Sequence, residues 1–206
     1  MNANPIFEES YENYLRQLAA VDLSVCAPIL NIAVEDAGET AAIPFFETTY
    51  RVSRFGVVDD RGQRPDYGIC VVLLKYLLTC PQQVPFQTDW VTHRDFRDSG
   101  QTQNQGLSSY ASTAISKHYA GNLSRLTAAV SVLGGRSPET DYPYDLSAII
   151  VALPRLPLLF LFNDADVQFP AQTSILYERR AERFLDAECR VMVDWYLLEQ
   201  LEKAER

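Results

Sequence analysis

The sequence has little histidine, and its cysteines are few and far apart. Its 206 residues include two histidines and four cysteines. Cys26, Cys70, Cys80 and Cys189 form no CxxC pair, and no Cys/His spacing suits zinc or an iron–sulfur cluster. A histidine-rich metal centre is therefore excluded, although a mixed carboxylate site is not. Because free cysteine packs like a small apolar residue, we expect four unpaired and mostly buried thiols.

Basic residues are also scarce. The chain has 18 Lys and Arg against 27 Asp and Glu, which gives a net charge of −9. The basic surface of a nucleic-acid-binding protein is missing, and an anionic membrane would repel such a chain. No apolar run approaches the ~20 residues of a membrane span, and the first residues show no secretion signal. We therefore expect a cytoplasmic protein that binds neither nucleic acid nor membranes.

Apolar periodicity predicts both helices and strands in the first part of the chain. Residues 6–20 have the spacing of an amphipathic helix, and Asp22 can cap a short second helix through Cys26 that Pro28 would limit. Residues 30–60 read as an antiparallel meander of strands. The stretch YGICVVLLKYLL is apolar nearly all round, which predicts a central buried helix at 67–78.

The second part of the chain also contains both predicted strands and predicted helices. The continuous apolar runs DLSAIIVAL (145–153) and LPLLFLF (156–162) predict two inner strands of a sheet covered on both faces. Residues 172–178 predict a further strand. Helices are predicted at 107–120, at 122–133 and from Ala181 onward. We therefore expect one α+β domain over residues 1–206, with a mostly antiparallel sheet packed against several helices.

Two stretches carry the candidate site residues, and the first is WVTHRDF at 90–96. It places the titratable ring of His93 and the fork-shaped cation of Arg94 close to the indole of Trp90. Such a histidine can do general acid–base work near neutral pH. The alternative is a strand end at which Arg94 pairs with an acid, because neighbouring strand residues point to opposite faces.

The second stretch is NDAD at 163–166, which follows a buried strand. In extended backbone Asp164 and Asp166 share one face, and paired carboxylates can bind a hard cation or serve as acid and base. The alternative is a structural turn closed by Asx hydrogen bonds, with Arg94 as the cationic partner. Phe169 completes the candidate surface. Between the two stretches, the polar SGQTQNQG at 99–106 predicts a mobile loop.

The chain resembles an uncharacterised bacterial family, domain of unknown function 3786, over roughly residues 11–200. The resemblance rests on LLKYLL, WVTHRDF, LGG and LPRLPLLFLFNDADVQFPAQTSILYE, in that order. In the family pattern the last strand leads into a tryptophan and an acidic DEEFP segment. Asn163 takes the tryptophan position here, and Asp166 is the one acid that remains of three. Some members carry an N-terminal iron–sulfur segment, which implies an indirect link to anaerobic redox or one-carbon metabolism.

These observations favour a cytosolic, non-catalytic binding or accessory module whose ligand is a protein or a small molecule. No nucleophile constellation or nucleotide-binding fingerprint is present, so we assign no catalytic residue, no cofactor and no metal. The candidate binding residues are Trp90, His93, Arg94, Asp164, Asp166 and Phe169. The alternative is an enzyme whose pocket uses the histidine, the arginine and the two aspartates, with or without a divalent cation.

Overall fold

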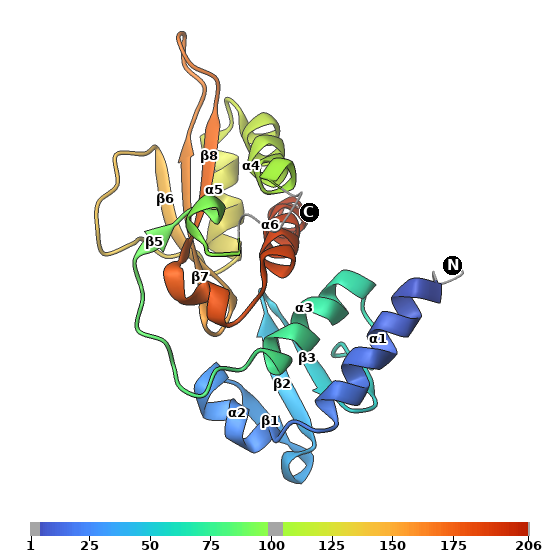
Figure 1. Cartoon of the computed structure of the whole chain (residues 1–206). Coiled ribbons are helices and arrows are strands. Elements are labelled where there is room, and N and C mark those ends of the chain that lie inside the picture. The colour runs from blue at the N-terminus through green and yellow to red at the C-terminus, as the bar shows by residue number, and fades with distance from the viewer. Residues whose placement is uncertain (1–4, 99–104, 206) are drawn as a thin grey trace.

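The computed structural model describes residues 5–98 and 105–205 and confirms the α+β fold (Figure 1). The predicted mobile loop falls mostly at 99–104, outside the described residues. The strands form two four-stranded antiparallel sheets, with the orders β1-β2-β3-β4 and β5-β8-β7-β6. In Figure 1 the first sheet and its helices form the lower part of the molecule, and the second sheet with α4, α5 and α6 forms the upper part.

The lower part is built from the first half of the chain. Its elements are α1 (Pro5–Leu18), α2 (Leu23–Leu30), β1 (Ala33–Glu35), η1 (Asp36–Gly38), β2 (Thr40–Phe45), β3 (Thr48–Ser53), β4 (Gly56–Val58) and α3 (Tyr67–Leu78). The amphipathic first helix and the antiparallel meander are both confirmed.

The second helix, α2, is longer than predicted. Asp22 caps it as expected, because its carboxylate accepts a hydrogen bond from Ser24 N at 3.0 Å. The helix then continues through Pro28 to Leu30, so the prediction that the proline limits it is wrong. A proline inside a helix removes one backbone hydrogen bond, and tertiary packing can outweigh that loss. Here the packing is provided by Leu30, which is fully buried.

The buried helix predicted at 67–78 is confirmed as α3. Asp66 caps it by accepting from Ile69 N at 3.1 Å. Eight of its side chains are buried, and they belong to a hydrophobic cluster that includes residues from both sheets. Tyr76 also reaches across this cluster, since its hydroxyl donates to Leu30 O at 3.0 Å and accepts from Arg155 N at 3.1 Å. This helix is thus the central element between the two parts.

The upper part is built from the second half of the chain. Its elements are β5 (Trp90–Val91), η2 (His93–Asp95), α4 (Gln105–Tyr119), α5 (Leu123–Val132), β6 (Leu146–Leu153), β7 (Leu156–Asn163), β8 (Gln172–Glu178), η4 (Arg179–Arg183) and α6 (Ala187–Lys203). The C-terminal α-helix begins six residues later than the predicted Ala181, because η4 comes first. Figure 1 shows the β7–β8 hairpin projecting beyond the helices.

Only one of the two apolar runs forms an inner strand. β7 lies between β6 and β8, and its residues 158–162 are all buried. β6 is the edge strand of the described sheet, so the prediction of two inner strands is wrong for β6. Its backbone is nevertheless partly satisfied, because Arg136 and Ile149 exchange two hydrogen bonds of 3.1 and 2.7 Å. An edge covered in this way can be as apolar as an inner strand.

Candidate functional site

A cavity of about 710 Å³ lies in the upper part, where η2, α4 and β8 meet. One wall is the segment Thr92–Arg94, and the second wall is the face of α4 that carries Ser112, Ser116 and Lys117. The third wall is residues 170–175, the exit of the hairpin turn and the start of β8. The cavity thus brings together segments that are far apart in the sequence.

The segment that carries His93 is shaped by its own polar residues. Thr92 N and Thr92 Oγ1 donate to Asp95 Oδ2 at 2.8 and 2.7 Å, which closes a capping box around η2. The hydrogen bonds from the threonine side chain and backbone lower the pKa of Asp95. Before this turn, Val91 of β5 pairs with Tyr177 of β8. The sequence T-x-x-D therefore turns the chain at the sheet edge and presents His93 to the cavity.

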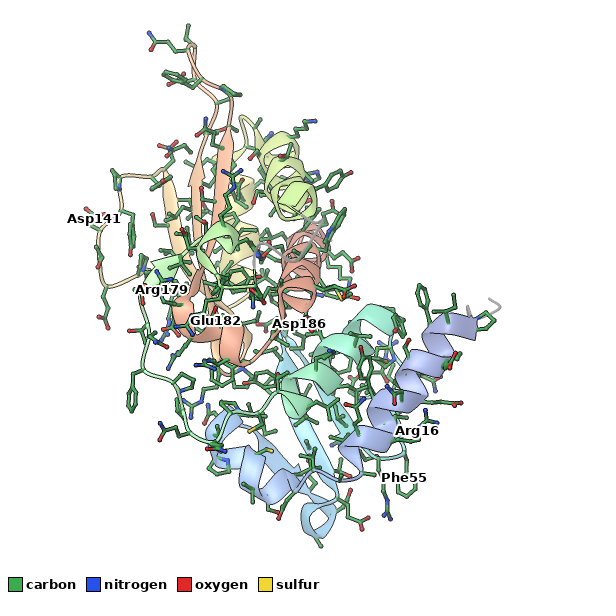
Figure 2. All side chains as sticks on the ribbon, in the orientation of Figure 1. Arg16, Phe55, Asp141, Arg179, Glu182 and Asp186 are labelled. Carbon is green, nitrogen blue, oxygen red and sulfur yellow. The ribbon has the colours of Figure 1, made fainter. Side chains whose placement is uncertain are left out.

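Two residues of η4 hold the same segment from outside. Arg179 Nε lies 2.7 Å from Asp89 Oδ2, and its backbone N donates to Asp89 O at 2.8 Å. Glu182 Oε2 accepts from Arg97 N at 3.1 Å. Figure 2 shows Arg179 and Glu182 on the turn that follows β8. Residues 89–97 are thus fixed at both ends, so the histidine has a fixed backbone.

His93 is oriented by a buried carboxylate. Its Nε2 lies 2.8 Å from Oδ2 of Asp194, a residue of α6 whose exposed fraction is 1%. The other oxygen, Oδ1, accepts from the Tyr177 hydroxyl at 2.6 Å. Burial and the charge of Asp194 raise the pKa of Tyr177 well above its ordinary value, so the phenol keeps its proton and donates. A carboxylate with two donors fixes both the ring orientation and the tautomer of the histidine.

A buried arginine extends this polar network behind the cavity. Arg190 is fully buried and donates to the Leu185 carbonyl and to Asp98. Its guanidinium lies 4.0 Å from the centre of the Phe96 ring. Its own carbonyl oxygen lies 2.9 Å from the Tyr177 hydroxyl and shares that group's one proton with Asp194. The back wall of the site is therefore held by hydrogen bonds as well as by apolar packing.

The lining of the cavity is basic and rich in hydroxyl groups. Arg94 and Lys117 supply cations, and no Asp or Glu is among the described residues that line it. Ser116 Oγ donates to Ser112 O at 2.8 Å and lies 2.9 Å from Thr173 Oγ1. The charge of this lining is positive, whereas the net charge of the whole chain is −9.

Comparison with known families agrees with the sequence resemblance. The family described as Domain of unknown function (DUF3786) matches residues 22–200. The chain belongs to this family. No curated protein and no solved structure matches the chain.

The DUF3786 match includes every wall of the cavity and the part of α6 that carries Asp194. Within this part of the chain the two aspartates of NDAD serve the backbone. Asp164 Oδ1 accepts from Gly121 N at 2.6 Å and from Ala165 N at 2.7 Å. Asp166 Oδ1 accepts from Gln168 N at 2.7 Å and from Phe169 N at 2.6 Å. The bonds from Ala165, Gln168 and Phe169 are those of a structural turn, as one of the two alternatives predicts, whereas the bond from Gly121 ties the turn to the connection between α4 and α5.

The six candidate residues are not brought to one place. His93 and Arg94 line the cavity, but Asp164 and Asp166 are not among its described lining residues. No hydrogen bond or ion pair joins Arg94 to either aspartate within the described part of the chain, so the predicted pairing is wrong. Extended backbone carries the hairpin turn away from η2, as Figure 1 shows.

The two aromatic candidates also lie elsewhere. Trp90 packs on the outer face of the second sheet, beside a separate cavity of about 370 Å³ that it lines with Tyr142. Phe169 lies at the hairpin tip with 62% of its surface exposed. The contribution of Asp194 was missed in the sequence, although one signal was present. Arg190 and Asp194 interrupt the apolar pattern of α6 four residues apart, a spacing that puts both on one helix face.

The structure also shows how the possible metal ligands and the thiols are arranged. No group of three or more His, Cys, Asp or Glu residues in the described ranges could hold a metal ion. All four cysteines are unpaired, and three are buried while Cys80 is half-buried, which confirms the prediction.

No helix within residues 5–98 and 105–205 is both long and apolar enough to cross a membrane.

Proposed function

We propose that the protein is a binding module for a small anionic molecule, held in the cavity between η2, α4 and β8. The observation that supports this best is the cavity lining. Arg94, Lys117 and several hydroxyl groups face a space with no carboxylate among its described residues, in a chain whose net charge is −9. An acidic protein repels anions in general, so a cation-lined cavity is a local exception that a specific anion can use.

The size and chemistry of the cavity suit such a ligand. Its volume of about 710 Å³ lies within the usual range of small-molecule sites, about 300–1,000 Å³. An arginine fork binds a carboxylate or a phosphate through two parallel hydrogen bonds, and the Lys117 ammonium adds a point charge. Ser116 and Thr173, already 2.9 Å apart, offer hydroxyls for the less charged part of the molecule. A small carboxylate or phosphate fits all three features.

The accessory role belongs to the same proposal. The hairpin tip exposes Phe169 and Val167, and Asp166 fixes the backbone between them. An ordered apolar tip is typical of a surface that contacts another protein. We place the module in the cytoplasm. Its family resemblance supports an indirect link to anaerobic redox or one-carbon metabolism.

A thermal-shift and calorimetry series tests the anion site. The probes are succinate, citrate and inorganic phosphate, with choline chloride as a cationic control. A ligand at about 100 times its Kd adds about 2.7 kcal/mol to the unfolding free energy, which a melting curve resolves. Arg94→Gln and Lys117→Gln should each weaken anion binding about tenfold or more, as for one lost charge-assisted contact.

The matched control is Arg16→Gln. Arg16 is an exposed arginine of α1 (Figure 2), so this variant has the same change of charge outside the cavity. The proposal fails if none of the three anions shifts the melting curve. It also fails if Arg94→Gln binds them as tightly as Arg16→Gln does.

A further inference from the structure

The geometry around His93 determines which of its ring nitrogens can act as a base. Nε2 faces Asp194 Oδ2 at 2.8 Å, and the Tyr177 hydroxyl donates to the other oxygen of the same carboxylate. An ionised carboxylate only accepts hydrogen bonds, so Nε2 carries the proton. In the neutral ring the lone pair is then on Nδ1. No hydrogen bond from the described residues occupies Nδ1.

His93 also lies where a ligand in the cavity could reach it, as a general base requires. His93 lines the cavity, and 16% of its side chain is exposed. Asp194 holds the ring from inside and is itself 1% exposed, so water does not compete for this contact. No carboxylate lines the cavity within the described ranges, so the histidine is the base that a ligand there would meet. A histidine held by a buried carboxylate has the arrangement of a general base.

We propose that His93 is a general base that hydrolyses a small ester carrying a carboxylate. The inference rests on the proposed anion site, because Arg94 and Lys117 would bind the carboxylate of the substrate. The role of Asp194 is that of a positioning residue, since it acts through the histidine and does not touch the substrate.

The reaction needs only the ester and water. Nδ1 of His93 takes a proton from water while the water oxygen bonds to the ester carbonyl carbon, whose π electrons move to the carbonyl oxygen. The tetrahedral intermediate then collapses, the carbon–oxygen bond to the alcohol breaks, and the leaving oxygen takes the proton from the imidazolium. The products are the acid and the alcohol, and the histidine returns to its neutral form.

The cavity also supplies donors for the negative oxygen of the intermediate. Thr173 Oγ1 lies 2.9 Å from Ser116 Oγ, whose other contact is the Ser112 carbonyl at 2.8 Å. Ser116 has one proton, which it donates either to the Ser112 carbonyl or to Thr173 Oγ1; in the second arrangement the threonine hydrogen is left to donate into the cavity that Thr173 lines. Such a donor is most useful when it lies in place before charge develops on the substrate.

The test compares two esters of similar length on the full chain. One is the mono-4-nitrophenyl ester of succinate, which carries a carboxylate, and the other is neutral 4-nitrophenyl pentanoate. Wild type should hydrolyse the charged ester with the higher kcat/KM. His93→Gln should lower that kcat/KM by about 10²–10⁴-fold, the usual contribution of a general base. It should leave the Kd of succinate within about threefold, because glutamine keeps a donor for Asp194.

The chain offers a matched control in its other histidine. His118 of α4 contacts Glu205 and Arg125 and does not line the cavity, so His118→Gln should leave the rates unchanged. Wild type that binds succinate but hydrolyses the charged ester no faster than His93→Gln would overturn the catalytic inference and leave the anion site standing. If succinate does not bind and the two esters react at equal rates, both proposals are wrong. Asp194→Asn should lower kcat more than it raises KM, and equal changes in both would contradict the positioning role.

Discussion

Asp186 and Lys75 join the two parts of the molecule. Oδ1 of Asp186 caps α6 by accepting from Cys189 N at 3.0 Å, while Oδ2 lies 3.2 Å from Nζ of Lys75 on α3. Figure 2 shows Asp186 at the start of α6, facing the lower part of the molecule. Burial acts to raise the pKa of Asp186, but the hydrogen bonds from Cys189 and Lys75 outweigh it and the net pKa is lowered.

A lowered pKa makes stability depend on pH in one direction. The folded chain holds the ionised form of Asp186, so its contribution is present above the ordinary value of 3.8 and is lost as the pH falls through the lowered folded value. We expect urea unfolding of wild type to show this loss below about pH 4, and that of Asp186→Asn to show less of it. An equal acid dependence in both proteins would contradict the assignment.

The cap and the ion pair should differ in strength. Asp186→Ala removes both and should cost about 1–2 kcal/mol of unfolding free energy, mainly through the lost N-cap. Lys75→Met removes only a partly exposed ion pair and should cost about 0–1 kcal/mol. Urea unfolding at pH 7 measures both. A larger loss in Lys75→Met than in Asp186→Ala would show that the ion pair, not the cap, is the important contact.

Phe160→Ala should be strongly destabilising. Phe160 is fully buried on inner strand β7 and belongs to the cluster that includes residues of both sheets. Truncating such a side chain leaves a cavity and costs about 3–5 kcal/mol. Val167→Ala is the control, because Val167 is fully exposed at the hairpin tip and should change stability by less than about 0.5 kcal/mol. A loss below about 1 kcal/mol for Phe160→Ala would contradict the position of β7 in the core.

The predictions from sequence succeeded where a local signal decided the structure. Asp22 precedes an apolar run at a cap position, and it caps the expected helix. The apolar run of β7 marks a truly inner strand. The run of β6 looks the same in sequence, yet β6 is an edge strand. Its apolar character is compatible with that position because the segment around Arg136 pairs with part of its free edge. A contact between distant segments of this kind leaves no periodicity to read.

In the candidate site, too, local signals could be read from the sequence and contacts between distant segments could not. His93 and Arg94 of the candidate stretch WVTHRDF line the cavity, and polar side chains beside a short strand are a local signal that sequence can offer. Asp194 is 101 residues further along the chain and lies within a buried helix, so no spacing rule connects it to His93. The predicted pairing of Arg94 with Asp164 or Asp166 is wrong because it, too, depended on how two distant segments are placed in space. The turn hydrogen bonds of Asp166 could be predicted locally, but neither the contact of Asp164 with Gly121 nor the direction of the projecting hairpin could.

The hairpin turn depends on Asp166 as a hydrogen-bond acceptor and not as a charge. Its Oδ1 accepts from Gln168 N and Phe169 N at 2.7 and 2.6 Å. Asp166→Ala should therefore cost about 0.5–1.5 kcal/mol, the net worth of such hydrogen bonds. Asp166→Asn keeps an acceptor oxygen and should stay within about 0.5 kcal/mol of wild type. Thermal unfolding with and without calcium provides the check, and a calcium-dependent rise in wild type that Asp166→Asn loses would indicate a cation site instead.

The thiols should react slowly in the native protein. Burial raises the pKa of Cys70 to about 11, and burial together with the neighbouring thiol of Cys26 raises the pKa of Cys80 to about 12. The reactive thiolate is therefore rare at neutral pH. Titration with a disulfide reagent at pH 8 should label Cys80 first, since it alone is half-buried, and should label four thiols in denaturant. Fast labelling of all four without denaturant would contradict the burial.

Tyr177 and Asp194 should be energetically coupled. Tyr177→Phe removes the hydroxyl whose one proton is shared between Asp194 Oδ1 and Arg190 O, and it should cost about 1–3 kcal/mol because all three groups are buried. Asp194→Ala leaves His93 Nε2 without its acceptor and leaves the tyrosine hydroxyl with the Arg190 carbonyl alone, so it should cost more. In the double variant the hydroxyl is already gone, and the two costs should sum to more than the measured loss by about 0.5–3 kcal/mol. Urea unfolding of the four proteins completes the cycle. Additivity within about 0.5 kcal/mol would mean that Tyr177 does not support the carboxylate that orients His93.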